Sequence, residues 1–178
     1  MERQGLIIGI DYTNEYSQVC YYNSRHGRPQ SIAENGQAMR YLIPTAVCYN
    51  REESRWMIGK EAMDYAAAEG SSIYRDLLDT ALASRQSILV ADKNYTYTQF
   101  LAVFIGKLVE LVQGHSGLMN ITSVTVNLRK IDLEIKAVLE EAFGYLGFDT
   151  SKVNLVSCAE SFAYFVMDGG AQVEANGG

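Results

Sequence analysis

The sequence has little of what marks fibrous, membrane-spanning or nucleic-acid-binding chains. It holds only 2 prolines among 178 residues, and its 15 glycines follow no repeat, so it is not collagen-like or linker-like. The formal net charge is −6 and Lys and Arg form no long run, which argues against binding to nucleic-acid phosphates. No apolar run reaches the ~20 residues of a membrane span, and the first residues lack a signal-peptide pattern. We therefore predict a cytoplasmic protein with neither nucleic acid nor membrane as a partner.

Cysteine and histidine are too sparse to indicate a metal centre. Cys20, Cys48 and Cys158 show no C-x-x-C spacing, and neither histidine has a second ligand at metal-binding spacing. We expect the three thiols to be reduced and to pack as small hydrophobic groups.

The order of predicted elements indicates an α/β domain. Strands are expected at 6–11, 17–23, 29–33, 41–49, 57–60, 87–91, 121–126 and 153–156, and helices at 61–68, 74–83, 130–146 and 159–167. A further helix begins at a capping box formed by Thr96 and Gln99 and ends at the glycine of residues 115–117. The first strand reads as a buried apolar run that ends in Asp11.

These elements predict one mixed sheet of about five strands, with the first three antiparallel and the later ones parallel. Strands that are joined through helices pair in parallel by right-handed crossovers, and the helices cover both faces of the sheet. Residues 70–95 show the weakest secondary-structure pattern and are interpreted as an insertion. The tail at 169–178 is rich in Gly and Ala and is interpreted as flexible or cut within a domain.

Several short segments, in this order, resemble the first lobe of the actin-like ATPases, whose core topology is ribonuclease-H-like. Among these proteins the DnaK-type heat-shock chaperones are the most similar. The segments are Gly9-Ile10-Asp11-Tyr12-Thr13, Gly27-Arg28-Pro29, Ile43-Pro44-Thr45-Ala46-Val47, Ile121-Thr122-Ser123-Val124-Thr125-Val126 and Ser157-Cys158-Ala159-Glu160. The resemblance covers residues 5–168 apart from the insertion at 70–95. Residues 1–168 are interpreted as an N-terminal lobe, and the resemblance implies a second lobe of the same protein beyond Gly178.

The resemblance implies a Mg-ATP or Mg-ADP site between the two lobes. Asp11 would hold the hydrated magnesium, and Tyr12, Thr13 and Asn14 would contact the nucleotide. Glu160 would act catalytically by orienting the attacking water. Magnesium prefers oxygen ligands and keeps several waters, and a second acid can order water for phosphoryl transfer.

The sequence departs from the family at the phosphate-binding turn and at the catalytic lysine. The family's Gly-Thr-Thr after the aspartate is replaced by Thr13-Asn14-Glu15, where a β-branched residue and an added carboxylate disfavour close approach of phosphates. Tyr74 stands at the position of the lysine, and the neighbouring Arg75 is a weak substitute. We expect nucleotide binding without efficient hydrolysis, and the chain alone to be inactive.

Two further departures and four alternative interpretations bear on function. Asn127 replaces a family proline, and Gly169-Gly170 does not match the second phosphate loop. A degenerate module for interaction or assembly, which needs no ATP, explains the same departures. A ribonuclease-H-like nuclease would need a third acid and a basic face. Asp11 as a turn residue and Glu160 as an acid placed at a helix N-terminus also remain open.

Overall fold

The structure is a computed structural model that describes residues 5–23, 27–33 and 41–167. The expected tail at 169–178, which includes Gly169-Gly170, and one of the two histidines, His26, lie outside the described residues. The elements are β1 (Leu6–Tyr12), β2 (Tyr16–Asn23), β3 (Arg28–Ile32), β4 (Ile43–Pro44), β5 (Val47–Asn50), β6 (Arg55–Ile58), α1 (Gly59–Glu69), β7 (Ile73–Tyr74), α2 (Leu77–Ala83), β8 (Ser87–Val90), β9 (Lys93–Thr96), α3 (Tyr97–Ser116), β10 (Ile121–Leu128), α4 (Leu133–Tyr145), the 3₁₀ turn η2 (Thr150–Lys152), β11 (Val153–Ser157) and α5 (Cys158–Met167).

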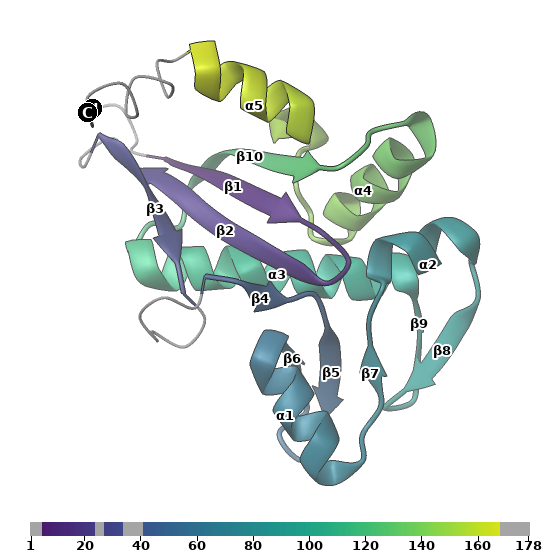
Figure 1. The fold of residues 1–178 in the computed structure, drawn as a ribbon. Coiled ribbons are helices and arrows are strands. Elements are labelled where there is room, and N and C mark those ends of the chain that lie inside the picture. The colour runs from purple at the N-terminus through teal and green to yellow at the C-terminus, as the bar shows by residue number, and fades with distance from the viewer. Residues whose placement is uncertain (1–4, 24–26, 34–40, 168–178) are drawn as a thin grey trace, which may run out of the picture.

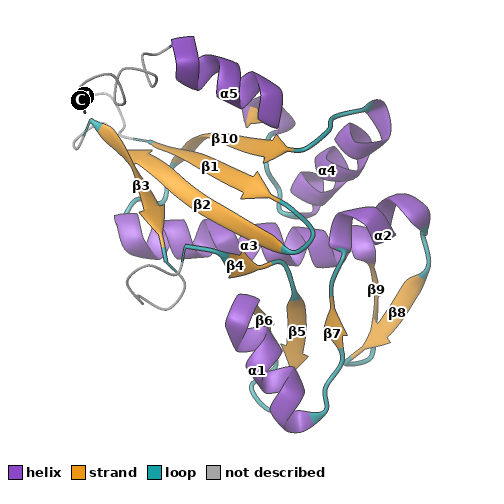
Figure 2. Ribbon diagram, in the orientation of Figure 1, coloured by secondary structure: helices purple, strands orange, loops and turns teal. Residues whose placement is uncertain are grey.

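The central sheet is mixed, as predicted. Its five strands lie in the order β11-β10-β1-β2-β3, and the short β4 pairs with β2. The pairs β1–β2 and β2–β3 are antiparallel, whereas β1–β10 and β10–β11 are parallel. Figures 1 and 2 show α3 beneath this sheet and α5 on its other side.

The first strand is buried on one face only, and the expectation of a fully buried run is wrong. Leu6, Ile8 and Ile10 are at most 1% exposed, while Ile7 is 44% exposed on the opposite face. Successive side chains of a strand point to opposite faces, so the even-numbered residues of β1 face the core and Asp11 does not.

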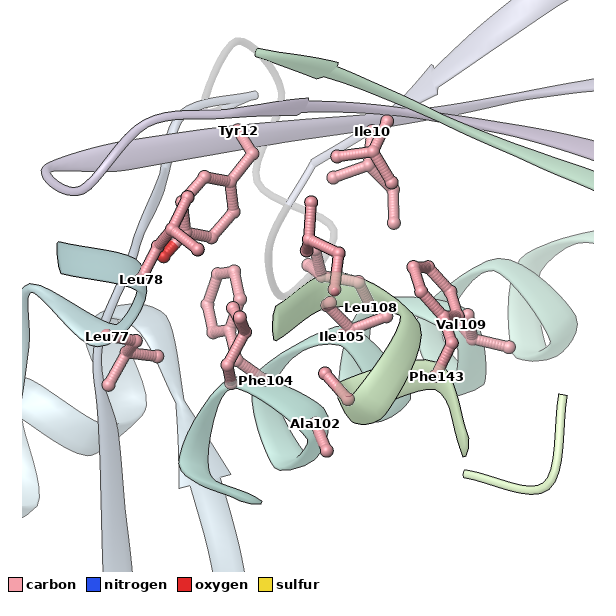
Figure 3. Close-up of a cluster of buried hydrophobic side chains, with 14 of the residues drawn as sticks. Ile10, Tyr12, Leu77, Leu78, Ala102, Phe104, Ile105, Leu108, Val109 and Phe143 are labelled. Carbon is pink, nitrogen blue, oxygen red and sulfur yellow. The ribbon is translucent and has the colours of Figure 1, made fainter. Parts of the chain in front are cut away.

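The core lies between the sheet and helices α2, α3 and α4. Figure 3 shows Ile10 and Tyr12 of β1 above Phe104 and Leu108 of α3, with Phe143 of α4 beside them. The predicted capping box starts α3: the Thr96 hydroxyl accepts from the Gln99 amide, and the Gln99 side chain accepts from the Thr96 amide. Helix α3 therefore forms the layer against which β1 and the turn after it pack.

The expected strand at 41–49 is broken in two, which corrects the prediction. Pro44 has no N–H to continue a ladder, the Thr45 amide donates to the Glu15 carbonyl, and the Ala46 amide turns back to the Pro44 carbonyl. The chain then leaves the central sheet, and β5 pairs with β6 and β7 in a separate three-stranded sheet. Residues 70–95 form β7, α2 and the β8–β9 hairpin.

No helix among the described residues has both the length and the apolar character needed to cross a bilayer.

Candidate functional site

The carboxyl ends of the three parallel strands meet at one edge of the sheet. Asp11 of β1 pairs in register with Asn127 of β10, and Leu128 pairs with Ser157, the last residue of β11. Helix α5 starts directly after Ser157. In open α/β sheets, ligands bind outside the carboxyl ends of the strands. This edge is therefore the candidate site.

A small polar network joins the residues of this edge. Asn127 Nδ2 donates to Asp11 Oδ1 at 2.8 Å and approaches Cys158 Sγ at 3.6 Å. Asn127 Oδ1 accepts from Ser161 Oγ at 3.1 Å. Sequence comparison noted Asn127 only as a departure and missed that it links β1 to α5. The one available signal was its place at the end of a parallel strand.

Asp11 opens into a shallow hollow of about 260 Å³ on the sheet face that lies away from α3. Its lining includes Gly9, Asp11, Gln18, Cys20, Asn127 and Ser161. Burial raises the pKa of the Cys20 thiol, and the Asp11 carboxylate adds to this shift, so this cysteine is a poor nucleophile at neutral pH.

The donor atoms at Asp11 fit a hydrated magnesium ion and no fully protein-bound metal. Nowhere in the described part of the chain do three His, Cys, Asp or Glu side chains converge to hold a metal. Asp11 has its second carboxylate oxygen free of hydrogen bonds to the described residues, and oxygen groups of Gln18 and Ser161 line the same hollow. Magnesium is commonly held by one or two carboxylates together with waters and phosphates.

Thr13, which the resemblance places in contact with the nucleotide, closes the turn after β1. Thr13 Oγ1 donates to the Tyr16 carbonyl at 2.6 Å and accepts from the Tyr16 amide at 3.1 Å. The Thr13 amide also donates to the Tyr16 carbonyl. The hydroxyl is therefore engaged within the turn, and a phosphate would have to compete with these contacts.

Tyr12 points into the core and anchors the turn from below. Its side chain is 3% exposed and meets Phe104 edge to face at 6.4 Å between ring centroids. Burial raises the pKa of the Tyr12 hydroxyl well above its usual range, while the Leu78 amide partly offsets this shift. The Tyr12 ring therefore belongs to the core.

Two further hollows flank the turn. One, of about 320 Å³, is lined by Asn14, Glu15, Thr45, Arg75 and Asp76. The other, of about 590 Å³, is lined by Thr13, Asn14, Glu15, Asp79, Arg129 and Lys130. The structure thus brings Arg75 beside the predicted turn, and it adds Arg129 and Lys130, which were not among the residues expected from the sequence.

Glu160 occupies the third position of a capping box at the start of α5. Its carboxylate accepts from the Ser157 amide at 2.7 Å and the Ser157 hydroxyl at 2.8 Å, and the Glu160 amide donates back to that hydroxyl at 3.2 Å. The Ser157 amide and then its hydroxyl lower the pKa of Glu160. This is the arrangement expected of an acid at a helix N-terminus.

Glu160 also lines a different hollow from Asp11. That hollow, of about 430 Å³, lies along β11 between α4 and α5 and includes Lys136, Asn154 and Tyr164. The two predicted acids, Asp11 and Glu160, therefore line separate hollows, and Glu160 caps its own helix.

A family model described as "Family of unknown function (DUF5716) C-terminal" matches residues 28–176 of the chain. The match includes Asn127 and Glu160 and does not extend to Asp11 or the turn that follows it. A search of curated proteins found no match.

Proposed function

Since the chain belongs to the DUF5716 family, whose description names no activity, we propose from its geometry that it is an actin-like, ribonuclease-H-like lobe that binds a magnesium nucleotide at the carboxyl edge of its sheet. The observation that carries the proposal is the Asp11–Asn127 contact of 2.8 Å at the ends of two parallel strands, next to the start of α5. The resemblance to the heat-shock chaperones supports the same location for ATP or ADP.

Asp11 carries the metal role in this proposal. The Asn127 amide donates to one oxygen of Asp11 and so orients the carboxylate, whose other oxygen has no hydrogen bond to the described residues. Ser161 holds Asn127 in turn. Bound magnesium would supply charge neutralisation of the phosphates. Asp11 would hold it through water, as one carboxylate does in many phosphate sites.

Hydrolysis is expected to be slow because two of the groups that speed phosphoryl transfer are otherwise engaged or replaced. The Glu160 carboxylate accepts both hydrogen bonds that Ser157 offers, so it is not poised to orient a water. Tyr74, at the position of the family lysine, is 8% exposed and stacks on Phe100 at 4.1 Å. The chain therefore favours binding over turnover.

Thermal unfolding of the full-length gene product with and without Mg-ATP or Mg-ADP tests the proposal. A ligand that binds only the folded state at 100 times its Kd stabilises it by about 2.7 kcal/mol. We expect this gain to need magnesium and to shrink in Asp11→Asn. The matched control is Asp92→Asn, because Asp92 is exposed in the β8–β9 turn and Asn tolerates its positive φ of 67°. Equal gains in both variants would contradict a role for Asp11.

A second candidate is an interaction module that needs no nucleotide. The observation in its favour is the apolar surface of α5, where Phe162 and Tyr164 are each 67% exposed and Met167 is 82% exposed. Phe162 and Tyr164, two positions apart, lie on different sides of the helix, whereas Tyr164 and Met167, three positions apart, lie on the same side. Exposed apolar side chains that share one side commonly mark a contact with another protein or lobe. Under this alternative, Phe162→Ser weakens a protein contact, and neither nucleotide nor Asp11→Asn changes stability beyond the effect of Asp92→Asn.

A further inference from the structure

The last strand of the central sheet, β11, is paired on one side only. Its partner is β10, and no other strand lies beside it in the part of the chain that the structure describes. An edge strand presents unpaired backbone N–H and C=O groups, with which another strand can pair. The opposite edge strand, β3, begins with Arg28 and Pro29, a charge and a proline that disfavour such pairing, whereas β11 contains neither. The β11 edge is therefore open to a further strand.

The core is also incompletely covered at this edge. Val153 and Leu155 pair in register with Val124 and Val126 of β10, so all four side chains point to the same side of the sheet. Val124 and Val126 are at most 1% exposed, whereas Val153 and Leu155 remain half-buried. They border the hollow of about 430 Å³ along β11, where Ile131 adds further apolar surface. A strand that pairs with β11 would cover these side chains.

The charges at the two ends of β11 favour a second copy of the chain as the occupant. Lys152 precedes the strand and Glu160 follows it in the first turn of α5, and both are exposed. Neither lies within 4.0 Å of an opposite charge among the described residues. In an antiparallel pair of β11 strands, the Lys152 end of one copy meets the Glu160 end of the other. A parallel pair would set like charges beside each other, which is destabilising.

The side chains of β11 are self-complementary in the same arrangement. If Leu155 lies opposite its counterpart in the second copy, Val153 lies opposite Ser157 and Asn154 lies opposite Val156. Residues that point to the core side in one copy then adjoin residues that point to the core side in the other. A two-fold axis at Leu155 uses the same surface of both copies, so the contact closes as a dimer.

We propose that two copies of the chain associate through antiparallel pairing of their β11 strands, with Leu155 at the two-fold axis. The contact covers Val153 and Leu155 of both copies and brings Lys152 of each copy near Glu160 of the other. It needs no nucleotide, so its test is independent of the proposed function.

Analytical ultracentrifugation of the full-length protein tests the association, across roughly a hundredfold range of concentration around the micromolar level. We expect a monomer–dimer equilibrium. Lys152→Glu places like charges at both ends of the interface and should raise the dimer Kd roughly tenfold, as should Glu160→Lys. The double variant exchanges the two charges and should restore most of the wild-type affinity. The matched control is Lys93→Glu, because Lys93 is exposed in the separate β8–β9 hairpin.

Disulfide cross-linking of the full-length protein tests the register. Leu155→Cys places one thiol of each copy across the two-fold axis, within reach of a disulfide. The control Leu89→Cys lies 65% exposed in the β8–β9 hairpin and should cross-link no more than the wild type, whose Cys20, Cys48 and Cys158 are present in every variant. Circular dichroism checks that each variant is folded.

Cross-linked dimer specific to Leu155→Cys, together with rescue by the double charge exchange, would support the proposal. Three results would overturn it: a wild type that stays monomeric over the whole range, a dimer that is indifferent to Lys152→Glu and Glu160→Lys, or equal cross-linking of the two cysteine variants.

Discussion

Replacing Tyr12 by Phe removes one hydroxyl from beneath the candidate turn and leaves the ring in place. The hydroxyl is 3.5 Å from Asn14 Oδ1 and lies near the Leu78 amide, while the ring keeps its edge contact with Phe104. The change therefore tests how the turn is anchored without opening a cavity in the core.

At neutral pH we expect a modest loss of stability. A neutral buried hydrogen bond contributes about 1 kcal/mol net. In a domain of this length, about 1 kcal/mol lowers the unfolding midpoint by roughly 2–4 °C. Urea unfolding at pH 7.5 measures the difference. The control is Tyr22→Phe, since Tyr22 is exposed on β2 and should show little change.

At alkaline pH the wild-type advantage over Tyr12→Phe should vanish and then reverse slightly, because the loss of about 1.4 kcal/mol by pH 11 exceeds the initial gain of about 1 kcal/mol. Burial raises the folded-state pKa of Tyr12 above the unfolded value of about 10. The stability that depends on this proton is fully present below pH 10 and is lost as pH rises toward the folded pKa. At pH 11 the ionised unfolded state costs the wild type about 1.4 kcal/mol, a cost that Phe does not carry.

The assay is a series of urea midpoints between pH 8 and pH 11 for wild type, Tyr12→Phe and Tyr22→Phe. We expect the wild-type advantage over Tyr12→Phe to shrink by about 1.4 kcal/mol across this range, and Tyr22→Phe to track the wild type. A gap that stays constant with pH would refute the burial of the Tyr12 hydroxyl and the anchoring role derived from it.

Three further predictions concern the helices that frame the site. Thr96→Ala removes the side-chain cap of α3 and should cost about 0.5–2 kcal/mol by urea unfolding, and a change below this range would contradict the capping box. Gly147→Ala should destabilise by about 1–2 kcal/mol because Gly147 has φ +71° after α4, whereas Gly144→Ala, inside α4 with nothing within 4 Å of an added Cβ, should be neutral or stabilising. Glu160→Ala should lower the thermal midpoint, and Glu160→Gln, which can also close the capping box, should lower it less. Because the folded pKa of Glu160 is lowered, the benefit of its ionised form is present above the usual Glu pKa and fades as pH falls through the folded value. Equal thermal midpoints for Glu160→Ala and Glu160→Gln would contradict the capping role of Glu160.

Local signals in the sequence were enough for most of the elements. The Thr96–Gln99 capping box and the apolar face that follows it placed α3, and Gly147 ended α4 as expected. The β-branched run at 121–126 placed β10, and its link through a helix implied the parallel pairing with β1 and β11. The helices and the strand are set by neighbours in the chain, so periodicity could indicate them, whereas the parallel pairing followed from the order of the elements.

The break between β4 and β5 and the layout of the site depend on contacts that are distant in sequence. The Thr45 amide is held by the Glu15 carbonyl, and the Thr45 hydroxyl is buried against Ser17 at 2.8 Å. The bond between Asn127 and Asp11 spans 116 positions, so no local pattern announces it. The resemblance predicted that Asp11 and Glu160 act in one site. In the structure, however, the hydrogen bonds from Ser157 hold the Glu160 carboxylate at the start of its own helix.

The most direct measurement of the central proposal is calorimetric titration of the full-length protein with Mg-ATP, in wild type and Asp11→Ala, with and without magnesium. We predict saturable binding by the wild type that requires magnesium and that weakens in Asp11→Ala. Absence of binding by a folded wild-type protein, or binding that is indifferent to both magnesium and Asp11, would contradict a nucleotide site at the end of β1.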